Sequence, residues 1–134
     1  MTTITEIEGI GNAFAQKLRK AGIQTTEALL KQGATPKGRK ELAKATGFKE
    51  RTILEWVNRA DLFRVPGIGA QYSDLLEAAG VDTVRELAVR DPKMLAATLA
   101  KVNSEKNKTN KLPGLKQVGT WIKAAKSLPR AVEY

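Results

Sequence analysis

Two glycine-rich turns are the parts of this sequence best suited to bind another group. Gly9-Ile10-Gly11 and Gly67-Ile68-Gly69 each place an isoleucine between two glycines, just before a stretch with helical spacing. Glycine admits backbone angles that other residues avoid, and the first amides of a helix lack intrahelical acceptors. Such a turn can therefore cradle an anion, most often a phosphate group. We name them the first and the second glycine turn.

The charges beside the two turns differ. Arg64 lies just before the second glycine turn, whereas Glu6 and Glu8 flank the first. No lysine or arginine follows directly after either turn, where Asn12 and Ala70 stand instead. We therefore expect the second turn to be the better phosphate ligand. The alternative for both is that the glycines only shape a tight turn between helices.

Basic residues are concentrated in two segments. Lysine and arginine total 23 against 14 acids, a formal net charge of +9, and the excess lies in residues 31–51 and 101–126. Such a field is typical of nucleic-acid binders, although a lysine-rich surface also aids solubility. The candidate nucleic-acid-binding residues are those of the turns, the first residues after them and nearby basic side chains: Gly67, Ile68, Gly69, Ala70, Arg64, Gly9, Ile10, Gly11, Asn12, Arg39, Lys40, Lys106, Lys108, Lys111, Lys116 and Lys123.

The composition excludes several classes of chemistry. The chain has no cysteine and no histidine, which rules out disulfides, thiolate or imidazole zinc sites and histidine-based triads. Its acids are scattered, without metal-ligand spacing, and no Walker-type loop is present. We expect no enzymatic activity, no metal and no cofactor. The first residues do not resemble a signal peptide and no apolar stretch approaches the roughly 20 residues that span a bilayer, so a cytoplasmic protein without membrane contact is expected.

An internal duplication organises the chain. Residues 7–30 recur as residues 65–88, with identical residues at eight positions that include both glycines of each turn. Trp56 and Trp121 also correspond, but with an offset larger by seven, so the second copy has gained residues. We assign the gain to residues 103–111, here named the insert. It is polar and lysine-rich without an apolar anchor, so we expect a mobile loop.

Apolar spacing and capping residues predict helices throughout. Gly22 and Gly80 stand where a helix ends in a left-handed residue, and Thr25 and Thr83 then cap the next helix. The predicted helices are 12–20, 26–31, 36–45 and 50–61 in the first copy, and 70–78, 84–90, 92–101 and 115–126 in the second. We expect an all-α fold of two tandem four-helix repeats, residues 1–61 and 62–134, packed as one compact body.

Aromatic side chains are few, at 5% of the chain. Trp56, Trp121, Phe14 and Tyr72 lie on amphipathic helices, which predicts core positions. Without an aromatic-rich stripe for base stacking, duplex is favoured over single-stranded nucleic acid.

The turns and their surroundings resemble the helix-hairpin-helix family. Its pattern of Gly-hydrophobic-Gly, a second helix, Ala-Gly-aliphatic and a threonine is present twice, the second time as 67–69 with Ala79-Gly80-Val81 and Thr83. The tandem pattern resembles DUF4332, a family labelled a domain of unknown function, over almost the full chain. The resemblance implies a SAM-like helix-hairpin-helix fold, and DNA binding without sequence specificity through hairpin amides.

Together these features predict a non-enzymatic module that binds the phosphates of duplex DNA. The alternatives are a protein-interaction module on the same helical scaffold and an RNA-binding module.

Overall fold

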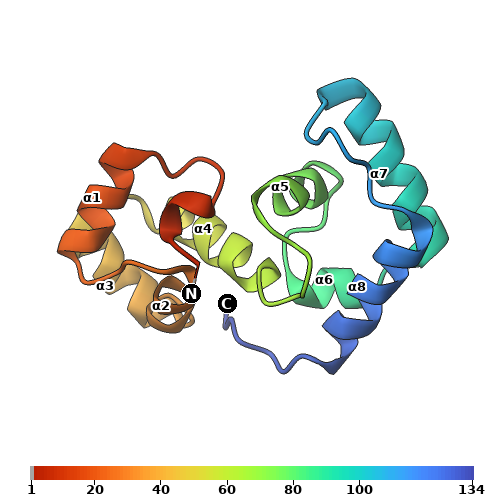
Figure 1. The fold of residues 1–134 in the computed structure, drawn as a ribbon. Helices are drawn as coiled ribbons and strands as arrows, with labels where there is room; N and C mark the ends of the chain where they lie inside the picture. Colours follow the sequence, from red (N-terminus) through yellow and green to blue (C-terminus); the bar gives the residue numbers. More distant parts are fainter. Residues whose placement is uncertain (1) are drawn as a thin grey trace. The chain divides into compact units, whose positions relative to one another are not determined.

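Residues 2–134 are described by a computed structural model, and within that range they form α-helices, one short 3₁₀ helix and no strand (Figure 1). The predicted all-α class is confirmed. The chain divides into two compact units, each described by itself below. The first unit runs to Asp61 and also contains Arg130–Tyr134, and the second comprises Leu62–Pro129. The sequence division at residue 61 lies at the same place, but the last five residues lie with the first unit.

The helices lie close to their predicted positions. The first unit contains η1 (Ile4–Glu6), α1 (Asn12–Lys20), α2 (Thr26–Gln32), α3 (Pro36–Thr46) and α4 (Glu50–Leu62), which ends one residue past the boundary. The second contains α5 (Ala70–Ala78), α6 (Val84–Ala88), α7 (Pro92–Lys106) and α8 (Leu115–Ser127). All predicted ends agree within two residues except that of α7, which continues five residues further.

Capping residues explain where the helices begin and end. Gly22 and Gly80 take φ values of 91° and 90°, as predicted for the residue after a helix. Thr25 and Thr83 then accept hydrogen bonds from amides three residues on, at 3.0 and 3.1 Å. These side chains satisfy amides that have no acceptor within the helix, so α2 and α6 begin at defined residues.

Each unit has its own apolar core. The core of the second unit consists of Leu62, Val65, Ile68, Leu75, Leu76, Val81, Val84, Leu87, Leu95, Leu99, Val118, Trp121, Ile122 and Ala125. In the first unit the buried apolar residues include Ile4, Ile7, Ile10, Ala15, Leu18, Ile23, Leu29, Leu42, Ile53, Trp56, Val57, Ala60 and Val132. The core positions predicted for Trp56 and Trp121 are confirmed.

Phe14 does not lie in the core. Its side chain is 43% exposed and packs against the rings of Phe48 and Trp56, with centroids 5.2 and 5.8 Å away. The core prediction for this residue was wrong because Phe48 contacts the same tryptophan and leaves Phe14 at the surface. Tyr72 is half-buried and packs against Trp121 at 5.1 Å.

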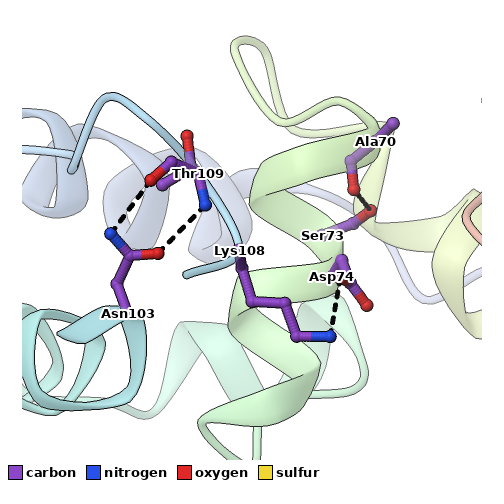
Figure 2. Close-up of polar contacts among 6 residues, drawn as sticks. All are labelled: Ala70, Ser73, Asp74, Asn103, Lys108 and Thr109. Atoms are coloured by element: carbon purple, nitrogen blue, oxygen red, sulfur yellow. Dashed lines mark hydrogen bonds and ion pairs between the residues drawn. The ribbon is translucent and has the colours of Figure 1, made fainter. Parts of the chain in front are cut away.

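The insert is not an unanchored loop, so that expectation was wrong. Its first residues continue α7 to Lys106, and Asn107 then ends the helix with a φ of 49°. The chain turns back toward α5, where Thr109 is 95% buried. The Asn103 side chain accepts a hydrogen bond from the Thr109 amide at 3.0 Å and donates one to its carbonyl at 3.1 Å (Figure 2). Polar groups, rather than an apolar residue, anchor the segment.

The C-terminal segment, Arg130–Tyr134, packs onto the first unit. The Val132 side chain is buried, and the Glu133 amide donates to the Ala34 carbonyl at 2.7 Å. The Tyr134 hydroxyl hydrogen-bonds the Asn58 side chain at 2.8 Å. The apolar and polar contacts together make this segment part of the first unit's core rather than a loose end.

Candidate nucleic-acid interface

The two glycine turns have the same backbone geometry. Gly9 and Gly67 have φ values of 95° and 92°, a left-handed conformation that strongly favours glycine. The isoleucines between the glycines are 4% and 5% exposed, and the amide of each donates to the carbonyl three residues earlier at 3.1 Å. Each turn is therefore held in place by its buried isoleucine side chain and by one backbone hydrogen bond.

The second glycine of each turn leaves the N-terminus of the following helix without a side-chain cap. Gly11 and Gly69 are extended N-cap residues without a side-chain cap. No atom outside the immediate chain lies within 4 Å of where a Cβ would stand on either of them. In α5 the first intrahelical bond runs from the Ser73 amide to the Gly69 carbonyl, so the amides of residues 70–72 have no acceptor within the helix. This end can receive an anion directly on the backbone.

The insert brings a lysine to the helix that follows the second glycine turn. The Thr109 hydroxyl donates to Gln71 Oε1 at 3.0 Å, and the Tyr72 hydroxyl donates to the Lys111 carbonyl at 2.9 Å. Gln71 and Tyr72 both lie in the first turn of α5. Lys111 is exposed at this position. The sequence lacks a cation directly after Gly69, and these hydrogen bonds hold the backbone of Lys111 beside the first turn of α5.

Two predicted basic residues of the second unit are engaged with protein groups. The Arg64 guanidinium, whose position favoured the second turn in the sequence, donates to the Pro129 carbonyl at 2.6 Å. The Lys108 ammonium lies 3.1 Å from a carboxylate oxygen of Asp74 on α5, and both side chains are partly buried (Figure 2). Lys108 therefore fastens the insert to α5. By contrast, Lys106, Lys116 and Lys123 are exposed, on the end of α7 and on α8.

Arg39 is buried in the first unit rather than displayed. Its side chain is 6% exposed and donates to the carbonyls of Gly33 at 2.8 Å and Glu133 at 2.7 Å. These bonds tie α3 to the C-terminal segment. Because the side chain is almost fully buried and two of its nitrogens already donate to carbonyls, we leave Arg39 out of the interface. The adjacent Lys40 is exposed.

The first glycine turn lies among acids. Asn12 is exposed at the start of α1, and Glu6 and Glu8 are exposed as well. Their carboxylates oppose an anion there. The first turn has the same backbone geometry as the second, but the charged side chains beside the two turns differ.

The described residues form an all-helical protein, and comparison with known protein families identifies its family. The family model of DUF4332, a domain of unknown function, matches residues 8–128, and the chain belongs to that family. No curated protein and no solved structure gives a significant match. Among residues 2–134, no helix is both long and apolar enough to cross a membrane.

Proposed function

We propose that the chain is a tandem helix-hairpin-helix protein that binds the phosphates of duplex DNA without sequence specificity and without catalysis. In this proposal each unit is one four-helix repeat. The equal φ values of Gly9 and Gly67, and of Gly22 and Gly80, support the assignment because they recur at the offset of the sequence duplication.

The observation that carries the proposal is the open N-terminus of α5. It combines uncapped amides, free space beside Gly69 and the anchored Lys111 on the same helical turn. Backbone amides and a helix dipole bind phosphate in any base sequence, which is why we propose binding without sequence specificity. The exposed lysines of α7 and α8 add a non-specific electrostatic attraction.

A duplex-binding titration by fluorescence anisotropy tests the proposal. The full chain should bind a short duplex at low salt. If about four phosphates are contacted, log Kd should change with log salt at a slope of about four. Single-stranded DNA and duplex RNA measured in parallel separate the nucleic-acid classes. Absence of duplex binding at low salt would contradict the proposed function.

Gly69→Asp and Gly11→Asp form a matched pair for locating the phosphate. Both positions are extended N-caps with open space, and aspartate is a preferred N-cap, so both variants should fold. Both also lower the net charge equally. Gly69→Asp should weaken duplex binding by about tenfold or more, which corresponds to loss of one charge-assisted contact. Gly11→Asp should weaken it by less than about threefold, because that turn already lies among acids. Equal losses in the two variants would mean that bulk charge, not the second turn, binds the phosphate.

A protein-interaction module on the same scaffold is the alternative. Among residues 2–134, the large apolar side chains with the greatest exposed fractions are Val89 at 79% and Met94 at 72%, which flank the start of α7. If the chain binds no nucleic acid in the titration, the protein-interaction alternative at this surface becomes the favoured hypothesis.

A further inference from the structure

An open depression of about 500 Å³ lies in the second unit, between the second glycine turn and the start of α8. Its walls include Gly67, Gly114, Lys116, Gln117, Thr120 and Trp121. The side chain of Lys116 is exposed and is the one charged group in this lining. The depression therefore offers a positive charge inside a concave surface.

The N-terminus of α8 opens into this depression. Gly114 is an extended N-cap with no side-chain cap, and the first bond within the helix runs from the Val118 amide to the Gly114 carbonyl at 3.0 Å. The amides of residues 115–117 consequently have no acceptor within the helix. These amides lie at the positive end of the helix dipole, and Lys116 in the same turn lines the depression.

The Trp121 side chain adds a hydrogen-bond donor, its indole N–H, at the wall of the depression. The side chain is 1% exposed, and no hydrogen bond of the indole N–H is found among residues 2–134. Indole Nε1 lies 3.2 Å from where a Cβ on Gly67 would stand, so this edge of the ring faces the glycine turn at the wall of the depression. Since the indole nitrogen itself is not fully enclosed, its N–H is open to the depression, where a ligand oxygen can accept a hydrogen bond from it.

We propose that the depression is a phosphate-binding site separate from the α5 terminus. Its donors are the first amides of α8, the Lys116 ammonium and the Trp121 indole N–H. A tetrahedral oxyanion can accept from all three kinds of donor at once, since it has several equivalent acceptor oxygens. The phosphate belongs to a free phosphate ester or to a nucleic-acid backbone, and only the latter case depends on the proposed function.

The first unit has a different lining at the corresponding place. At the offset of the two tryptophans, Thr120 corresponds to Glu55 and Leu115 to Glu50. Phe48 also packs edge-on against Trp56, with ring centroids 5.1 Å apart. Two carboxylates and an extra ring disfavour an anion there, so the proposal is limited to the second unit.

Nuclear magnetic resonance can read this site directly, because the two tryptophans give two indole N–H signals. The ¹⁵N-labelled full chain is titrated with inorganic phosphate at constant ionic strength, using chloride as the compensating anion. We expect the Trp121 signal to shift with a Kd on the order of 1 mM, the weak affinity of a small anion bound by few donors, while the Trp56 signal stays in place. A second titration with duplex DNA separates a backbone phosphate from a free one.

Two variants and a control complete the test. Lys116→Gln should weaken the phosphate response of Trp121 by about tenfold, and Thr120→Glu, which introduces the acid found in the first unit, should abolish it. Lys126→Gln removes the same charge elsewhere on the exposed face of α8 and should leave the response unchanged. A Trp121 signal that moves with neither phosphate nor duplex overturns the site, as does an equal response in Lys116→Gln and the unmodified chain. A Trp121 signal that moves with neither titrant while the chain still binds duplex in the anisotropy titration would overturn this site alone, so its failure and the failure of the proposed function are distinguishable.

Discussion

Replacement of Asn103 by alanine tests whether the insert is anchored as described. The Asn103 side chain makes two hydrogen bonds to the backbone of Thr109, at 3.0 and 3.1 Å, and Thr109 is 95% buried. At about 1 kcal/mol for each bond, with a further cost for leaving a buried amide and carbonyl unpaired, Asn103→Ala should lower the free energy of unfolding by about 2–3 kcal/mol. The hydroxyl contact from Thr109 to Gln71 should loosen with it, since that bond depends on the same placement.

Urea unfolding of the full chain, followed by circular dichroism, measures this loss. Asn110→Ala is the matched control, because Asn110 is an exposed asparagine in the same insert and should change stability by less than about 0.5 kcal/mol. Amide exchange supplies a local readout, in which the Thr109 amide should lose protection in Asn103→Ala only. The anchoring would be refuted if the two variants were equally stable and if the Thr109 amide were already unprotected in the unmodified chain. That result would support the expectation of a mobile loop instead.

Three further predictions concern the turns, Arg39 and one carboxyl group. Gly67→Ala should destabilise the second unit by about 1–2 kcal/mol in urea unfolding, because φ is 92°, whereas Gly69→Ala, at an extended and open position, should cost less than about 1 kcal/mol. Arg39→Met should lower the free energy of unfolding by about 3 kcal/mol because it leaves two carbonyls without donors. Lys40→Met removes the same charge from the surface and should leave the free energy of unfolding nearly unchanged. Similar losses in the two variants would contradict the buried role of Arg39. Hydrogen bonds from its own amide, the Thr2 amide and the Thr26 hydroxyl lower the pKa of Glu27. That stabilisation is complete above the unfolded-state pKa and is lost as pH falls through the folded-state pKa, so the melting-temperature deficit of Glu27→Gln should shrink from pH 7 toward pH 3.

The helices were predictable because their signals are local. Gly22, Gly80, Thr25 and Thr83 act on residues within one turn of themselves, and the structure has their left-handed angles and caps as expected. The duplication reinforced each prediction, since one copy could be checked against the other. Local signals of this kind do not depend on how distant segments meet.

The exceptions depend on contacts between distant residues. The end of α7 was missed because the polar run after residue 102 resembles a loop. Contacts with α5, such as the pairing of Lys108 with Asp74, 34 positions away, explain why the segment folds back. The available signal was an acid on α5 that the first copy lacks: glutamine stands at residue 16 in the corresponding place. Arg39 was assigned to the surface because a basic segment surrounds it, and its burial needs a C-terminal segment that is 94 residues distant at Glu133.

The two units show that the backbone geometry of a turn and the charge around it are separate consequences of the sequence. Gly9 and Gly67 impose the same turn, so both units offer an uncapped helix N-terminus. The side chains nearby then diverge, with exposed Glu6 and Glu8 beside the first turn and exposed Lys111 held against the first turn of the helix after the second. A helix dipole contributes only about 0.3–1 kcal/mol at an exposed site, which neighbouring charges of either sign can cancel or double. Under the proposed function, exchange of the neighbouring acids and lysines between the units should therefore move phosphate binding from the second turn to the first without a change in the backbone.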